Sequence, residues 1–168
     1  NLQRIEHRTL HTVGVGEGQL SEKLEDFENS LPVGLKLAYL PNVGKVRLRL
    51  SKTKESSGDL DLDMWTAKMR TFVEPYVFGE GETSISEALG QYLKDKGLKI
   101  GTAESCTGGF ISHLITGISG SSAYFEGSVV SYSNEVKTNV LNVKEETLIS
   151  YGAVSEDVVR EMLKGLLN

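Results

Sequence analysis

The sequence has few of the residues that stabilise secreted domains or anchor a chain in a membrane. It contains one cysteine among 168 residues, so no disulfide can form within the chain, and a lone thiol is typical of a reducing compartment. No run of about 18 apolar residues is present, and no signal-peptide pattern opens the chain. We therefore predict a cytoplasmic protein that does not cross a membrane.

An excess of positive charge is also missing. The chain has 18 Lys and Arg residues against 23 Asp and Glu, a net charge of −5, which excludes a general polyanion binder. The apolar and charged fractions are those of an ordinary globular protein. The first residue is Asn1 rather than Met, and the last helical pattern runs to Asn168, so we expect a piece of a longer protein.

The first half alternates strand and helix patterns in the order β-α-β-β-α-β, which predicts a small α+β domain over residues 1 to about 80. Pro41 to Gly44 gives a hairpin signal, and polar residues over 52–63 predict an exposed loop. The predicted elements are a strand at 5–13, a helix at 20–31, strands at 35–40 and 46–50, a helix at 65–73 and a strand at 77–78.

Two features of this half invite a binding role. Lys45, Arg47 and Arg49 share one strand face, but alternating charges on a strand are usually solvated, and the segment from Gly14 to Gly18 does not supply the G-x-x-G turn that clamps a nucleotide backbone. We therefore do not expect nucleic acid as a partner. His7 and His11 lack a third ligand nearby in sequence, so we interpret them as surface residues and predict no metal site.

From about residue 84 the pattern changes to strands that alternate with helices, which predicts parallel crossovers and an α/β layer. Ser84 and Glu87 form a capping-box signal for the first helix, and Ser155 is a predicted cap for the last one. Ligands of such sheets bind at the carboxyl ends of the strands. The predicted elements are helices at 85–97, 110–117, 134–141, 143–151 and 155–167, with strands at 98–103 and 124–132.

The segment from Leu98 to Phe110 is a strand, a tight turn and a helix start. Ser105 lies on the turn, close to helix N-terminal N–H groups that have no intrahelical partner and attract negative charge. Gly108 and Gly109 permit close approach of a substrate to the backbone, so a nucleophile and an oxyanion hole can share this turn. The alternative is that Ser105 is only a helix cap.

A serine nucleophile needs a base. The segment from Tyr132 to Lys137 also follows a strand end, so Lys137 can face Ser105, with Tyr132 as its partner and Glu104 fixing the lysine or binding a cationic ring. The alternatives are a solvated Lys137 and a core Tyr132. A second enzymatic hypothesis makes Cys106 the nucleophile, because thiolates are favoured at helix N-termini.

Two spaced motifs carry a family resemblance. Ala103 to Gly109 is Ala-Glu-Ser-Cys-Thr-Gly-Gly, and Tyr132 to Lys137 is Tyr-Ser-Asn-Glu-Val-Lys, with the stretches Gly120 to Gly127 and Gly152 to Ser155 matching the same pattern. In these motifs the second half resembles the C-terminal domain of the CinA (competence/damage-inducible protein) family, the nicotinamide-nucleotide amidase domain. The first half resembles, more weakly, the KH-like domain that precedes it in longer members.

The resemblance implies an α/β protein overall, with a KH-like α+β domain at residues 1–80 and a partial three-layer α/β amidase domain at 84–168. The family's amidase domain continues with further strands and a Gly-Ser-Gly-Pro-rich phosphate-binding loop, so we expect the domain here to be truncated at its C-terminus. Full-length members also carry an N-terminal nucleotide-processing domain that resembles molybdopterin-binding proteins.

The implied activity is hydrolysis of nicotinamide mononucleotide to nicotinic acid mononucleotide and ammonia, a step of NAD recycling, by a serine, lysine and tyrosine mechanism. Ser105 would be the nucleophile, Lys137 the base and Tyr132 its partner, in a homo-oligomer with a small nucleotide as substrate and no cofactor. The alternative is an inactive fragment that acts as a nucleotide-binding, RNA-binding or regulatory module. The expected substrate-binding residues are Glu104, Cys106, Thr107, Gly108, Gly109 and Asn134.

Overall fold

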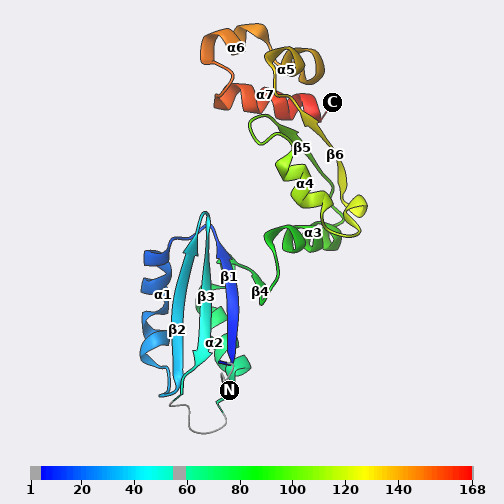
Figure 1. The fold of residues 1–168 in the computed structure, drawn as a ribbon. Coiled ribbons are helices and arrows are strands. Elements are labelled where there is room, and N and C mark those ends of the chain that lie inside the picture. The colour runs from blue at the N-terminus through cyan, green and yellow to red at the C-terminus, as the bar shows by residue number, and fades with distance from the viewer. Residues whose placement is uncertain (1–4, 55–59, 168) are drawn as a thin grey trace. The chain divides into compact units, whose positions relative to one another are not determined.

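The computed structural model describes residues 5–54 and 60–167, and its contacts divide the chain into two compact units, Asn1–Ala88 and Leu89–Asn168 (Figure 1). The sequence placed the domains at 1–80 and 84–168. In the structure the division falls inside a helix, α3 (Ile85–Lys96), whose first turn groups with the first unit.

The first unit is a four-stranded antiparallel sheet in the order β2-β3-β1-β4, with two helices on one face. This is the β-α-β-β-α-β order that the sequence predicted. The elements are β1 (His7–Val13), α1 (Glu17–Asn29), β2 (Leu35–Asn42), β3 (Lys45–Lys52), α2 (Leu62–Val73), the 3-10 helix η1 (Glu74–Tyr76) and β4 (Val77–Glu80).

Alternation along β3 decides which face of this sheet is buried. Val46, Leu48 and Leu50 are buried in the core beneath α1 and α2, because successive side chains on a strand point to opposite faces. Lys45 and the two arginines of the strand therefore stand on the face without helices. Leu20, Leu24 and Phe27 bring the apolar stripe of α1 into the same core.

The β2–β3 hairpin is tighter than the sequence indicated. Pro41 and Asn42 continue β2, and only Val43 and Gly44 form the turn, with Gly44 at a φ of 71°. Pro41 is tolerated in the strand because β2 lies at the edge of the sheet, where a missing N–H breaks no ladder. Of the predicted loop at 52–63, residues 55–59 lie outside the described residues, and Asp61 caps α2 by accepting from the N–H groups of Asp63 and Met64.

The second unit is built on a two-stranded parallel sheet, which confirms the predicted parallel crossover. Ser84 and Glu87 exchange hydrogen bonds at the start of α3, as the capping box predicts. After α3 come β5 (Ile100–Glu104), α4 (Phe110–Thr116), the 3-10 helix η2 (Ser121–Ala123), β6 (Phe125–Val130), α5 (Asn134–Leu141), α6 (Glu145–Tyr151) and α7 (Glu156–Leu166).

Buried side chains join these elements in two clusters. Leu141, Val158 and Met162 pack α5 and α7 against the strands, while Leu93 and Tyr124 belong to a cluster formed with α3 and α4. Ser155 accepts a hydrogen bond from the N–H of Val158 and caps α7 as predicted. Among the described residues, no helix combines the length and the apolar character needed to traverse a membrane.

Candidate active site

Ser105 and Lys137 meet at the carboxyl edge of the parallel sheet. β5 ends at Glu104 and β6 at Val130, and parallel strands bring these ends to the same edge. The Lys137 Nζ donates a hydrogen bond to the Ser105 hydroxyl at 3.2 Å and another to the Ser131 carbonyl at 2.6 Å. The structure therefore brings together the two residues that the sequence singled out as candidate nucleophile and candidate base.

Lys137 is buried, with 1% of its surface exposed. Its hydrogen-bond partners are neutral. Besides Ser105 and Ser131, the carbonyl of Tyr132 accepts from Nζ at 3.4 Å, and within the described ranges no carboxylate forms an ion pair with it. A buried amine held by neutral acceptors differs from the solvated lysine that the sequence left as an alternative. Its amine is aimed at one side-chain hydroxyl, that of Ser105.

The helix that carries Lys137 is fixed at both ends. Ser133 caps α5 by accepting from the N–H of Val136, and the Lys137 carbonyl accepts from the N–H of Val143 beyond the helix end. Leu141 packs in the cluster shared with α7. The first turn of α5 is thereby held in place, and with it the amine.

Glu104 does not have the place that the sequence gave it. Its carboxylate is 2% exposed and accepts from the N–H groups of Ile111 (2.9 Å) and Ser112 (2.8 Å) and from the Ser112 hydroxyl (2.6 Å). Burial raises the pKa of the Glu104 carboxyl, but these hydrogen bonds outweigh it and hold the pKa at about 2. Glu104 is thus an anionic cap of α4. Among the described residues, its carboxylate forms no hydrogen bond or ion pair with Lys137.

The turn between β5 and α4 leaves some of its amides free. The Gly108 N–H donates to the Ser105 carbonyl and the Phe110 N–H to the Thr107 carbonyl, each at 3.0 Å. Within the described part of the chain, the N–H groups of Cys106, Thr107 and Gly109 have no hydrogen-bond acceptor. These three amides follow Ser105 directly and are the candidates for an oxyanion hole.

Two glycines allow this turn to form. Gly108 has a φ of 59° and Gly109 of 93°, which are left-handed values that other residues rarely adopt. A side chain at Gly109 would also meet Val130 at 3.4 Å. The turn keeps Cys106 and Thr107 exposed, beside Ser105.

The remaining predicted residues are more exposed. Tyr132 is 74% exposed, and it accepts a hydrogen bond from Lys137 through its carbonyl, not through its hydroxyl. Asn134 lines a groove of about 490 Å³ between α5 and α6, together with Glu135 and Leu148. The described lining of that groove includes neither Ser105 nor Lys137.

The sequence missed a set of hydroxyl groups beneath the turn. Thr102 donates to Ser128 at 2.8 Å across the two strands, and Ser131 donates to the Glu104 carbonyl at 3.2 Å. The Ser112 hydroxyl also donates to the Glu104 carboxylate. The available signal was the presence of Ser and Thr at inward positions of otherwise apolar strands, which are stable only when they are hydrogen-bonded.

No metal centre is formed by the described residues, since no three His, Cys, Asp or Glu side chains gather there. The predicted surface histidine His11 is instead 8% exposed and lies on the sheet of the first unit. Its ring is buried by the segment after β4, to which its Nε2 is hydrogen-bonded at the Gly81 carbonyl.

Comparison with known proteins gives matches over both units. Residues 7–79 match the model of the damage-inducible protein CinA KH domain, and residues 82–168 match that of the CinA C-terminal domain. Ser105, Lys137 and Tyr132 all lie within the second match.

Similar full-length proteins come from several bacteria. CinA-like proteins of Cytophaga hutchinsonii and Flavobacterium psychrophilum are each 43% identical, over 94% of this chain and 38% of their own length. The crystal structure of the competence/damage inducible protein CihA from Agrobacterium tumefaciens is 40% identical over 49% of this chain and 50% of that one, with a TM-score of 0.48. The chain thus spans about 38% of the length of these curated relatives.

Proposed function

This chain belongs to the CinA family, and we propose that its second unit is a serine amidohydrolase that converts nicotinamide mononucleotide to nicotinic acid mononucleotide and ammonia. The observation that carries the proposal is the hydrogen bond of 3.2 Å between the buried Lys137 amine and the Ser105 hydroxyl. A serine becomes a nucleophile when an adjacent base takes its proton, and a lysine amine in its neutral form can be that base.

In the proposed first step the Ser105 proton passes to Lys137 while Oγ attacks the carboxamide carbon of the substrate. The carbonyl oxygen becomes an oxyanion, which the free N–H groups of Cys106, Thr107 and Gly109 can stabilise. The proton then moves to the departing nitrogen, ammonia leaves, and an ester remains on Ser105. Water activated by Lys137 attacks this ester, which releases the carboxylic acid and restores the hydroxyl.

Two further residues support these steps. Glu104 acts as a positioning residue, because its carboxylate fixes the N-terminus of α4 and so the turn that carries the amides. Tyr132 completes the proposed set as the partner of Lys137: its carbonyl accepts from Nζ, and its exposed hydroxyl is available to the substrate or leaving group.

Ammonia release from nicotinamide mononucleotide by the chain and its variants tests the proposal. We expect Ser105→Ala and Lys137→Ala each to lower the rate by at least about 100-fold, the usual range for loss of a nucleophile or general base. The exposed residues Ser119 and Lys144 provide matched controls, and Ser119→Ala and Lys144→Ala should keep the full rate.

A second readout does not depend on turnover. A serine-directed sulfonyl fluoride should modify Ser105, as mass spectrometry of the peptide would show, and Lys137→Ala should abolish the modification because the hydroxyl loses its base. Full ammonia release by both Ser105 and Lys137 variants, or equal labelling of Ser105 with and without Lys137, would overturn the mechanism.

A further inference from the structure

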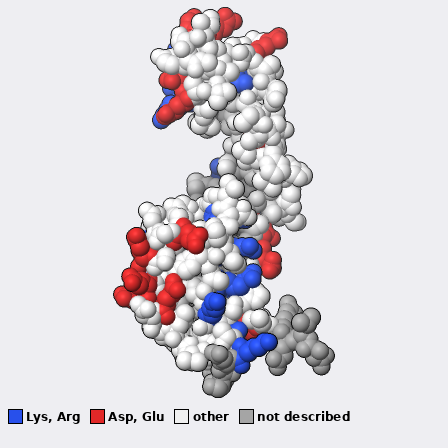
Figure 2. Space-filling model, turned by 60° about the vertical axis from the view of Figure 1, so that its left-hand side comes forward, with Lys and Arg blue, Asp and Glu red and all other residues white. Residues whose placement is uncertain are grey.

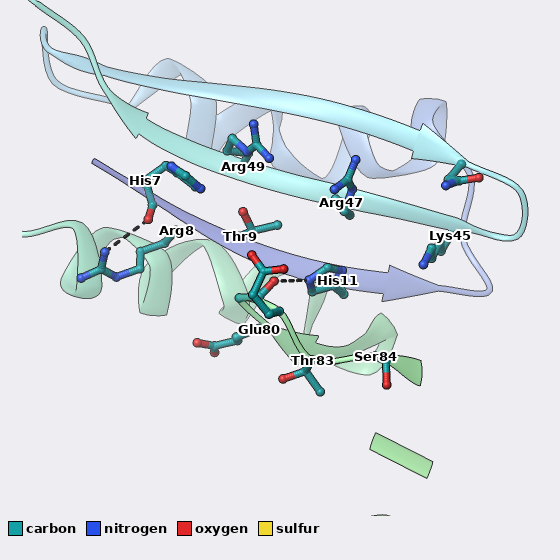
Figure 3. A pocket seen from close by; sticks show the side chains of 13 residues that line it. His7, Arg8, Thr9, His11, Lys45, Arg47, Arg49, Glu80, Thr83 and Ser84 are labelled. Carbon is teal, nitrogen blue, oxygen red and sulfur yellow. Dashed lines mark hydrogen bonds between the residues drawn. The ribbon is translucent and has the colours of Figure 1, made fainter. Parts of the chain in front are cut away.

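A polar groove of about 540 Å³ lies on the face of the first unit's sheet that has no helices (Figure 3). Its walls come from β1, β3, β4, the end of β2 at Asn42 and the segment that follows β4. This volume falls within the range of about 300–1,000 Å³ that is typical of small-molecule sites. All of its lining residues belong to the first unit, and none of them is a residue of the proposed amidase site.

Three cations of β3 line the groove without a counter-ion. Lys45, Arg47 and Arg49 alternate on one face, and the rise of a strand sets successive side chains roughly 7 Å apart. Each is half-buried, and within the described residues none of the three side chains forms an ion pair or a hydrogen bond. The sequence had favoured a solvated face, whereas Figure 2 shows Lys and Arg side chains gathered in a band on this unit.

The acidic residues near the groove do not neutralise this charge. Glu80 is paired with Arg70, and Arg8, a fourth basic residue of the lining, is paired with Asp63. Among the described residues, Glu82 is the one lining carboxylate that forms no ion pair. Three unpaired cations against one carboxylate leave the groove positive, although the chain as a whole is negative.

Buried polar atoms beside the arginines also lack partners. In the β1–β3 register His11 lies opposite Arg47, and Thr9 lies opposite Arg49. His11 is 8% exposed, and its Nε2 is 2.7 Å from the Gly81 carbonyl, which can only accept, so Nε2 carries the hydrogen. The His11 Nδ1 and the Arg49 Nε are buried with no hydrogen-bond partner, an arrangement that calls for an explanation such as a ligand.

We propose that this groove binds a small organic phosphate of nucleotide size, with Arg47 and Arg49 holding the phosphate oxygens. The planar guanidinium fork matches phosphate geometry in a way that a lysine does not, and Lys45 adds a third charge at the end of the row. Hydroxyl groups of Thr9, Thr83 and Ser84, which also line the groove, can bind the rest of the ligand (Figure 3).

A small ligand fits these observations better than a nucleic acid. The lining includes no Phe, Tyr or Trp on which a base could stack, and aromatic platforms are the usual partner of basic grooves that bind single strands. The net charge of −5 also opposes a long polyanion. The proposal does not rest on the amidase activity, since its residues belong to the other unit.

Isothermal titration of the full chain with inorganic pyrophosphate and with a nucleoside triphosphate, at low ionic strength, tests the proposal. We expect saturable binding that weakens with added salt. Arg47→Gln combined with Arg49→Gln should weaken it at least about tenfold, because charge-assisted bonds to phosphate are lost. Lys36→Gln is the matched control, since Lys36 is exposed on β2 outside the lining and its loss should change the affinity less than about twofold.

Amide NMR shifts are measured on the unmodified chain, so this second test does not depend on the folding of a variant. Pyrophosphate should shift resonances of residues 45–49 and 81–84 in particular. The proposal is overturned by the absence of saturable binding, by equal loss in the Lys36 control, or by shifts elsewhere in the chain. Tighter binding of a single-stranded oligonucleotide or of polyglutamate than of the nucleoside triphosphate would equally overturn it, in favour of a nucleic acid or an acidic protein.

Discussion

Gly165 of α7 lies so close to Leu141, at the end of α5, that a Cβ built on Gly165 would overlap the Leu141 carbonyl group. Backbone is in contact with backbone here, so no flexible side chain can move aside. Because α5 carries Lys137, this contact also sets the distance between α7 and the proposed base.

Gly165→Ala should therefore lower the free energy of unfolding by about 1–3 kcal/mol, the usual range for overpacking, and should lower ammonia release by displacing Lys137. Urea unfolding followed by circular dichroism measures the first effect. Gly101→Ala is the control in the same unit, because a Cβ there would lie 3.5 Å from the Gly127 carbonyl and the Leu166 side chain, an ordinary contact. Equal stability of the two variants would contradict the packing argument.

Glu104 makes the second unit sensitive to acid. The folded-state pKa of this carboxyl is about 2, below its ordinary 4.5, so its stabilising contribution is complete above about pH 4.5 and is lost as the pH falls toward 2. Glu104→Gln should cost about 1–3 kcal/mol at neutral pH and should flatten the stability profile of the unit below about pH 5. Chemical unfolding at several pH values measures both effects.

The control for this variant is Glu126→Gln. Glu126 pairs with Lys99 on the surface, where both side chains are more than half exposed, so its loss should change stability by less than about 1 kcal/mol. A profile of Glu104→Gln that stays parallel to that of the unmodified chain on acidification would show that the carboxylate does not act as described.

Cys106 should prove dispensable for the proposed hydrolysis. It is exposed next to Ser105. The Lys137 amine donates to the serine hydroxyl, and among the described residues it forms no hydrogen bond with the Cys106 thiol. Cys106→Ala should keep the rate of ammonia release within about threefold, since its backbone N–H is retained for the oxyanion. Loss comparable with that of Ser105→Ala would instead support the thiol as the nucleophile.

Tyr124 has a buried hydroxyl that gains nothing from its surroundings. The residue is 1% exposed, its hydroxyl has no hydrogen-bond partner, and it packs against Gly90, where a Cβ would come within 2.5 Å of the oxygen. Tyr124→Phe should therefore leave the unit equally stable or more stable by about 1 kcal/mol. Tyr92→Phe, at an exposed position, should be neutral in the same unfolding measurement. Destabilisation by Tyr124→Phe alone would reveal an unseen partner.

The order of elements and the pairing of Ser105 with Lys137 were predictable because they follow from local rules. Strand and helix periods fixed the elements, and the carboxyl ends of neighbouring parallel strands must meet. The family motifs added the roles that we propose for these two residues. The sequence therefore came close to the central contact, which the structure places at 3.2 Å.

Other features depend on contacts between distant segments. Glu104 is buried because the amides of α4 turn back toward it, and no sequence period reports that a carboxylate will serve as a cap from seven residues upstream. His11 is buried beside two residues distant in sequence, since its ring is hydrogen-bonded to the Gly81 carbonyl and lies against the Phe78 ring. The arginines of β3 look like a solvated stripe until the residues after β4 form the wall of a groove beside them.

The buried apolar side chains of the described residues fall into clusters that never mix the two units. Leu10, Phe27 and Met69 lie in the core of the first unit, while Leu93 and Val158 belong to cores of the second. A substitution in one interior therefore acts on the packing of its own unit. Substitutions in the groove of the first unit and in the turn that carries Ser105 can thus be selected one at a time, by natural variation or by design.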